Sequence, residues 1–318
     1  MMYLCPQDVF TAIKNGEISA IQACKTLREM EGSRRHTIYS ESTSVQHHRI
    51  EEVLAELDLL IGLREVKKLV REIYAFVEIQ KRRQKENLVA EPLVLHMIFK
   101  GNPGTGKTTV ARIIGKILRE IGVLNKGHLI EVERADLVGE YIGHTAQKTR
   151  EQMKKAYGGI LFIDEAYSLA RGGEKDFGKE AIDCLVKGIE ERRNELILIL
   201  AGYQKEMDQF MQTNPGFRSR FPIQIDFPDY SQQELLQIAE QICQSRQYRL
   251  TPQAKSLLIS MISVSENGHS DSRGNARTIR NMIEKAIRKQ AVRLISNKQI
   301  TRDDLMLIEP DDLLEVRT

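Results

Sequence analysis

Residues 101–108 read Gly-Asn-Pro-Gly-Thr-Gly-Lys-Thr, the spacing of a loop that binds polyphosphate. Glycine lets a backbone turn sharply and approach a ligand, so that successive N–H groups can point at phosphate oxygens from the start of a helix. A lysine at position 107 reaches the β- and γ-phosphates, and a hydroxyl at position 108 suits Mg²⁺. The predicted phosphate-binding residues are Gly101, Asn102, Pro103, Gly104, Thr105, Gly106, Lys107, Thr108 and Thr109. The alternative is an ordinary glycine-rich turn.

A second acidic motif, Asp164-Glu165, follows the apolar run at residues 160–163. An aspartate in this position can hold Mg²⁺ through its water shell, and a glutamate can orient and deprotonate an attacking water. The same pair could instead cap the helix that follows it. Combined with the phosphate loop, the pair predicts a nucleotide hydrolase in which Lys107 and Glu165 are catalytic and Thr108 and Asp164 hold the metal.

These residues need strands that end at one edge of a sheet and a helix that begins there. Five apolar runs of strand length alternate with helical patterns along the chain. They are residues 93–99, 128–132, 160–163, 196–200 and 223–227. This alternation predicts an α/β fold with a parallel five-stranded sheet that helices cover on both faces. Ligands of such sheets bind beyond the carboxyl ends of the strands, which is where the two motifs fall.

After residue 228 helical patterns replace the strand patterns. Ser231 and Glu234 have the spacing of a capping box, Thr251 precedes a first-turn proline, and Thr301 begins a last short helix. The chain is therefore predicted to have three parts. They are an N-terminal segment and linker at 1–48, an α/β core with lead-in helices at 49–228, and an all-helical domain at 229–318.

Composition narrows the class of protein. The chain has 318 residues, of which 41% are hydrophobic and 29% charged, with a net charge of +3. These values are typical of a soluble globular protein, and the charge is too small to indicate a nucleic-acid partner. The four cysteines lie too far apart in the sequence for a metal or redox motif, which favours reduced thiols. Since neither a signal peptide nor a membrane-length apolar run is found, we expect a cytoplasmic protein with no membrane partner.

Several of these motifs together resemble those of AAA+ ATPases. Besides the phosphate loop and Asp164-Glu165, the resemblance rests on the run from Asn214 to Phe221 and on Gly274-Asn275-Ala276-Arg277. It implies an α/β ATPase core followed by a helical lid domain, with ATP and Mg²⁺ bound at the core.

Other motifs are similar to one AAA+ branch, which holds the red-type Rubisco activases of the CbbX type and the stage V sporulation K proteins. They are residues 60–63, 136–145, 201–203 and 225–230. Residues 170–181 are most similar to the sporulation proteins. The likeness covers about residues 50–300 and leaves residues 1–48 outside it.

The resemblance implies roles for individual residues. Arg220 would be an arginine finger that contacts the γ-phosphate bound by a neighbouring subunit, with Arg218 as a weaker candidate. Arg277 would occupy the sensor-2 position, where a helix of the lid domain reports the γ-phosphate to the core, and Ile61 and Gly62 would contact adenine. By residue type alone, Arg220 could form a structural ion pair and Arg277 could be a solvated charge on an amphipathic helix.

Two further expectations concern loops. Tyr141, Ile142 and Gly143 match the pore loop of ring-shaped AAA+ remodellers, and the glycines around Tyr141 favour an exposed loop, although a lone tyrosine more often packs in a core or interface. A second loop at 171–178 is predicted to line the same pore. Many AAA+ proteins end the fourth core strand with a polar sensor residue. Here that region reads Ala-Gly-Tyr at 201–203, so no sensor-1 residue is assigned.

Taken together, the resemblance implies an ATPase that forms a homo-oligomeric ring of six subunits and remodels a protein client through a central pore, in a sporulation-associated role. The alternatives are a red-type Rubisco activase, a DNA-associated AAA+ loader and, least favoured, a monomeric P-loop kinase of small molecules. The identity of the client and the role of residues 1–48 are left open.

Overall fold

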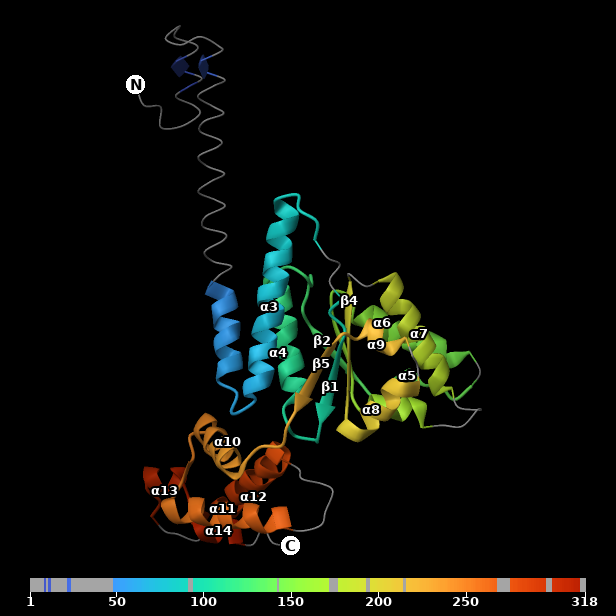
Figure 1. Ribbon diagram of the computed structural model, residues 1–318. Helices are drawn as coiled ribbons and strands as arrows, with labels where there is room; N and C mark the ends of the chain where they lie inside the picture. The colour runs from blue at the N-terminus through green and yellow to red at the C-terminus, as the bar shows by residue number, and fades with distance from the viewer. Residues whose placement is uncertain are drawn as a thin grey trace. The chain divides into compact units, whose positions relative to one another are not determined.

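The computed structural model describes residues 48–90, 94–141, 143–171, 177–192, 195–213, 216–267, 275–295 and 299–314, with residues 9, 11–12 and 22–23 (Figure 1). The chain divides into two compact units, residues 1–53 and residues 54–318. Most of the expected N-terminal segment and linker lies outside the described residues. The sheet and the C-terminal helices belong to the larger unit.

Within the described residues, five strands form a parallel sheet in the order β2-β3-β4-β1-β5. They are β1 (Met97–Gly101), β2 (Leu129–Val132), β3 (Gly159–Ile163), β4 (Leu196–Gly202) and β5 (Ile223–Phe227). The register places Phe99 of β1 opposite Ala201 of β4 and Ile225 of β5. Every residue of β3 and β4 is buried, which explains why these strands read as continuous apolar runs. The predicted α/β fold is confirmed.

Helices cover both faces of the sheet (Figure 1). One face carries α3 (Arg64–Lys85) and α4 (Lys107–Glu120). The other carries α5 (Arg134–Leu137), α6 (His144–Lys155), the 3₁₀ helix η1 (Ala166–Ala170), α7 (Gly178–Glu191), α8 (Gln204–Thr213) and α9 (Phe217–Arg220). None of the described helices combines the length and apolar character needed to cross a bilayer.

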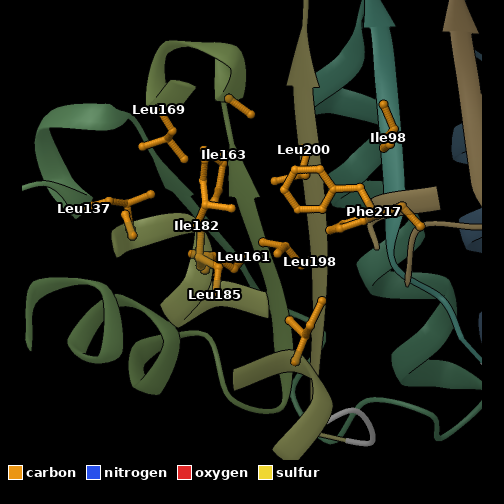
Figure 2. Close-up of a cluster of buried hydrophobic side chains, with 14 of the residues drawn as sticks. Ile98, Leu137, Leu161, Ile163, Leu169, Ile182, Leu185, Leu198, Leu200 and Phe217 are labelled. Atoms are coloured by element: carbon orange, nitrogen blue, oxygen red, sulfur yellow. The ribbon is translucent and has the colours of Figure 1, made fainter. Parts of the chain in front are cut away.

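A large apolar core lies on the second face. Figure 2 shows Ile98, Leu161 and Leu198 of the strands beside Leu185 of α7 and Phe217 of α9. These side chains are at most 3% exposed. Because β1, β3 and β4 are parallel and pack into one core, their carboxyl ends lie along the same edge of the sheet. The two predicted motifs lie at this edge.

The C-terminal helices enclose a second apolar core that includes Ile238, Leu258 and Ile283. The helices are α10 (Gln232–Ser245), α11 (Pro252–Asn267), α12 (Asn275–Ile295), α13 (Arg302–Met306) and α14 (Pro310–Leu314). The capping box at Ser231 is confirmed, and Thr301 also caps a helix. In addition, β6 (Arg249–Leu250) and β7 (Leu307–Ile308) form a two-residue parallel pair that the sequence patterns did not predict.

His96 lies just before β1, which begins at Met97, and its ring is almost fully buried. Its Nδ1 accepts a hydrogen bond of 3.1 Å from the Leu198 N–H, and its ring lies 5.9 Å from that of Phe221. Burial lowers the pKa of His96 to about 4 from the ordinary 6.5. The folded protein therefore holds a neutral imidazole here at neutral pH.

This buried imidazole predicts an acid-sensitive fold. Between the two pKa values the unfolded chain binds a proton at His96 and the folded chain does not, so stability falls as the pH drops through 6.5 towards 4. We expect His96 to account for about 2 kcal/mol of the stability lost between about pH 7 and about pH 5. Urea unfolding at both pH values should show a smaller loss in His96→Asn, which keeps a hydrogen-bond acceptor.

The exposed His144 offers a matched control, since His144→Asn should retain the wild-type loss of stability. If His96→Asn and wild type lost the same amount, a group other than His96 would carry the acid sensitivity.

Candidate nucleotide site between the sheet and the lid

A cavity of about 460 Å³ lies where the carboxyl ends of β1, β3 and β4 face the C-terminal helices. Its lining contains most of the residues that the sequence motifs selected. They are Ile61, Gly101, Pro103, Gly104, Gly106, Lys107, Thr108, Thr109, Asp164, Glu165 and Arg277. Asn102, Thr105 and Gly62 are not part of this lining. The two motifs and the lid arginine, far apart in the sequence, therefore converge on one cavity.

Lys107 is the first residue of α4, and its side chain is buried in the curve of the phosphate loop. Its Nζ donates hydrogen bonds of 2.8 Å to the carbonyl oxygens of Gly101 and Asn102. Burial lowers the pKa of Lys107, and the carboxylate of Asp164 opposes that shift. An anion in the loop would be a stronger partner for this ammonium than two neutral carbonyls.

The first turn of α4 forms one wall of the cavity, because Lys107, Thr108 and Thr109 all line it. The first N–H groups of a helix lack partners within the helix and carry the positive end of its dipole, which suits an anion. The Thr108 hydroxyl lies 3.4 Å from Glu131 Oε1 of β2. Thr108, Glu131 and Asp164 thus offer hard oxygen atoms of the kind that Mg²⁺ prefers.

Asp164 and Glu165 continue from β3. The Asp164 N–H donates to the Val132 carbonyl at 3.0 Å, and the Glu165 N–H donates to Asp164 Oδ1, also at 3.0 Å. Glu165 has a φ of 47°, which is uncommon for a residue other than glycine, and such outliers concentrate at functional sites. Its side chain is exposed and makes no capping hydrogen bond to η1. The helix-cap alternative for Glu165 is therefore not supported.

Part of the cavity lining is apolar. Leu60, Ile61 and Leu63 line it from the segment before α3, and Ile238 and Ile242 line it from α10. Gly62 has a φ of 63°, and a side chain there would collide with Glu234 of α10. Apolar lining residues of this kind suit contact with a heterocyclic base.

Several lining residues were not predicted from the sequence. Gln241 of α10 donates to the Leu59 carbonyl at 3.2 Å, and Arg280 follows Arg277 by one helical turn. Tyr203 and Tyr230 also line the cavity. The spacing of Arg280 from Arg277 was a usable signal, since residues three apart share a helix face. Tyr203 directly follows β4, so its place at the carboxyl end of a strand was also a usable signal, whereas the position of Gln241 depends on how the lid packs.

Arg220 is not among the residues that line the cavity. Its guanidinium pairs with Glu190 of α7, with 2.7 Å between Nε and Oε1, and Nη1 donates to the Gly216 carbonyl at 3.0 Å. The Arg220 and Glu190 side chains are 31% and 54% exposed, so this is a surface ion pair. Arg218 is exposed. Within one chain, then, Arg220 does form an ion pair of the kind considered as its alternative role.

Tyr141 is 66% exposed, which excludes a core position for it. Its ring lies edge-on to that of His144, with centroids 5.5 Å apart. Gly143, with a φ of 82°, precedes α6. Ile142, residues 172–176 of the second loop, and the motif residues Asn214, Pro215 and Gly274 lie outside the described residues.

Comparison with known proteins agrees with this geometry. The family model for the "ATPase family associated with various cellular activities (AAA)" matches residues 97–229, and the AAA lid domain model matches residues 231–317. The AAA domain of FIGL-1, solved in complex with ADP, superposes with a TM-score of 0.54 at 19% identity, covering 81% of this chain and 82% of that one. This structural likeness supports the fold alone.

Curated relatives are much more similar in sequence. Stage V sporulation protein K of Bacillus subtilis is 51% identical over 94% of this chain and 94% of its own length. Protein CbbX of Cereibacter sphaeroides is 49% identical over 77% of this chain and 79% of its own length. The chloroplastic ribulose bisphosphate carboxylase/oxygenase activase of Cyanidioschyzon merolae is 45% identical over 86% and 94%.

The phosphate loop, the acidic pair after β3 and the lid arginine share one cavity, and both family models and the curated relatives match the chain. The chain therefore belongs to the AAA family of ATPases, in the branch that contains the stage V sporulation K and CbbX proteins, and it binds and hydrolyses ATP.

Proposed function

We propose that this chain forms a ring in which each ATP is bound between two copies, and that hydrolysis drives the remodelling of a protein client. One observation carries the proposal. The cavity is lined by arginines of the lid, Arg277 and Arg280, but not by Arg220 of the core, which pairs with Glu190 elsewhere on the same chain. Because Arg220 lies outside the cavity of its own chain, its guanidinium is available to reach the cavity of a neighbouring chain.

In this proposal the ATPase core comprises residues 49–228, the lid comprises residues 229–318, and the protein works in the cytoplasm. The phosphate loop, including Asn102 and Thr105, holds the triphosphate, and Lys107 contacts the β- and γ-phosphates. Ile61, which lines the cavity, and the adjacent Gly62 are the proposed adenine contacts. Thr108 and Asp164 hold Mg²⁺, Asp164 partly through water, and the ion when bound neutralises the charge that develops on the phosphate oxygens.

Glu165 is the proposed general base. Its side chain is exposed and lines the cavity. Its φ of 47° puts the backbone in the left-handed region directly after β3, and strained backbone of this kind concentrates at functional sites. In this position Glu165 orients the attacking water and takes its proton. Arg277, on the first turn of α12, contacts the γ-phosphate, so that the lid reports its presence to the core.

Arg220 is the proposed arginine finger. A half-exposed ion pair contributes about 0–1 kcal/mol, so exchanging Glu190 for the phosphate of a neighbouring chain costs little. Contacts in which one chain offers the cavity and the next offers Arg220 are head-to-tail, and such contacts close into rings. The number of subunits, six, is taken from the AAA+ resemblance.

The proposed client contact is Tyr141. Its ring is two-thirds exposed and so is accessible to a partner, and the adjacent groove is lined by the polar side chains of Glu140, Gln147 and Lys148. With Ile142 and Gly143, Tyr141 would grip an extended polypeptide by its ring while the loop moves with the state of the nucleotide. The loop at 171–178 is proposed to line the same pore.

Mixing two inactive variants tests the shared site. Lys107→Ala loses its phosphate contact, and Arg220→Ala should lose about 10³-fold or more in rate. In rings assembled from equal amounts of both, about a quarter of the interfaces join an intact loop to an intact finger, so the mixture should recover about a quarter of wild-type ATPase activity.

The matched control mixes Arg220→Ala with the double variant Lys107→Ala/Arg220→Ala, in which every interface lacks the finger. No recovery is expected there. If the first mixture stayed as inactive as its components, the site would not be shared and the ring proposal would fail.

Glu165→Gln and Tyr141→Ala together test client remodelling. Glu165→Gln should bind ATP within about threefold of wild type but hydrolyse it about 10²–10⁴-fold more slowly, and so retain its client. Adding Tyr141→Ala should release the proteins that Glu165→Gln retains, whereas adding Tyr141→Phe should not. Mass spectrometry of the co-purified proteins measures both effects.

The surface variant Glu191→Gln is the control for the carboxylate-to-amide change, and it should keep wild-type turnover. Identical co-purified proteins with Tyr141→Ala and with Tyr141→Phe would argue against contact through this ring.

The relatives of this chain suggest two different kinds of client. We propose the sporulation-associated role because stage V sporulation protein K matches at 51% identity over 94% of both chains. The 45% identity to a Rubisco activase makes activation of that enzyme the second candidate. A DNA-associated loader is a further alternative, which the net charge of +3 disfavours.

Effector responses separate these classes. For the sporulation-associated role, we expect the ATPase rate to change less than about twofold with ribulose bisphosphate or with DNA, because neither is part of its work. A marked response to ribulose bisphosphate would favour the activase. Stimulation by DNA that falls steeply with salt would favour the loader.

A further inference from the structure

The segment that joins β5 to the lid carries a carboxylate, Asp229, which lies between the phosphate loop and α12. We propose that Asp229 is a positioning residue that fastens the lid to the phosphate loop and so sets Arg277 relative to the bound nucleotide. The inference rests on the proposed function, in which Arg277 contacts the γ-phosphate. We name the trio Asn102, Asp229 and Asn275 the lid clasp.

On the core side, the clasp holds the phosphate loop. Asn102 Nδ2 donates to both carboxylate oxygens of Asp229, at 2.9 Å and 3.0 Å. The carbonyl of the same Asn102 accepts from Lys107 Nζ and from the Thr105 hydroxyl, each at 2.8 Å. A change in the position of Lys107 on binding phosphate is therefore transmitted to the residue that Asp229 holds.

On the lid side, the clasp holds the first residue of α12. Asn275 Nδ2 donates to Asp229 Oδ1 at 2.9 Å, and its Oδ1 accepts from the Tyr230 N–H at 3.1 Å. Asn275 is 6% exposed and has a φ of 42°, so its side chain is held in one place and its backbone is restricted. The next residue, Ala276, donates its N–H to the Gly104 carbonyl at 3.2 Å.

Arg277 follows directly, on the first turn of α12. Rotation of the lid away from the core would separate Asn275 from Asp229 and leave amide and carboxylate groups without their partners, which is costly where those groups are buried. The direction in which Arg277 enters the cavity is thus tied to the shape of the phosphate loop. Tyr230 adds a parallel tie, because its hydroxyl donates to the Thr105 carbonyl at 3.2 Å.

A donor–acceptor exchange tests the clasp. In Asp229→Asn, an amide oxygen at the Oδ1 position would still accept from Asn102 and Asn275, but without the negative charge. The new NH2 at the Oδ2 position would meet the Asn102 amide donor to donor. In Asn275→Asp, two carboxylates face one another. The double variant Asp229→Asn/Asn275→Asp restores a donor–acceptor pair between positions 229 and 275. Its new amide at position 229 would accept from Asn102 and donate to the new carboxylate at position 275, which would still accept from the Tyr230 N–H. Neither change places a charge on the phosphate loop itself.

We expect each single variant to lower kcat about tenfold while changing the KM for ATP less than about threefold. Hydrogen exchange of residues 275–295 with ATPγS bound should be faster by about tenfold, with residues 159–163 of β3 unchanged. The double variant should return kcat to within about threefold of wild type. A merely structural role would instead move the melting temperature and the exchange of the whole chain together.

Asp226→Asn is the matched control, since it makes the same chemical change on an exposed residue of β5 and should behave as wild type. If one single variant does not fold, the other gives the same comparison with the double variant. Wild-type kcat in both singles, or a double variant as slow as the singles, overturns the clasp.

Arg277→Ala separates failure of the clasp from failure of the proposed function. If Arg277→Ala is slow and Asp229→Asn is not, the clasp alone is wrong. If Arg277→Ala turns over at the wild-type rate, the role of Arg277 in the proposed function is wrong, and so is the claim that the clasp acts through it.

Discussion

The nucleotide site depends on the path of the backbone between β1 and α4. Gly101 leaves β1 with a φ of 154°, and a Cβ there would collide with the carbonyl oxygen of Phe227 on β5. Gly106 enters α4 with a φ of 96°, where an L side chain would be strained. Only with glycine at both points can the loop leave the sheet, curve around Lys107 and begin α4 at the cavity. A side chain at Gly101 would also push β5 and the segment that leads to the lid.

The same loop contacts both halves of the larger unit. It continues from β1, which is paired on both sides in the sheet, and its carbonyl groups at Gly104 and Thr105 accept hydrogen bonds from Ala276 and Tyr230 of the lid side. A packed protein interior transmits small displacements because it has little free space. The proposed coupling of ATP to the lid is consistent with this continuity between loop, sheet and lid.

The nucleotide site does not show which of the relatives' functions this chain shares. Proteins named for sporulation and for Rubisco activation match this chain at 51% and 45% identity over most of its length. Phosphoryl transfer needs the same cradle, carboxylates and arginines whatever the work that follows, so the fold and the site carry little information about the client. The proposed client contact, the loop of Tyr141, lies on a surface that this chemistry does not constrain.

Local patterns in the sequence determined much of this protein. The strand-loop-helix order around Lys107, the apolar runs of β3 and β4 and the capping box at Ser231 depend on neighbouring residues, so they can be predicted from spacing alone. Tertiary structure alone decided the long-range contacts. Asn102 and Asp229 are 127 positions apart, and Arg220 and Glu190 are 30 apart. Hydrogen bonds and ion pairs of this kind form only after strand register and helix packing have brought their partners together, and no sequence period encodes them.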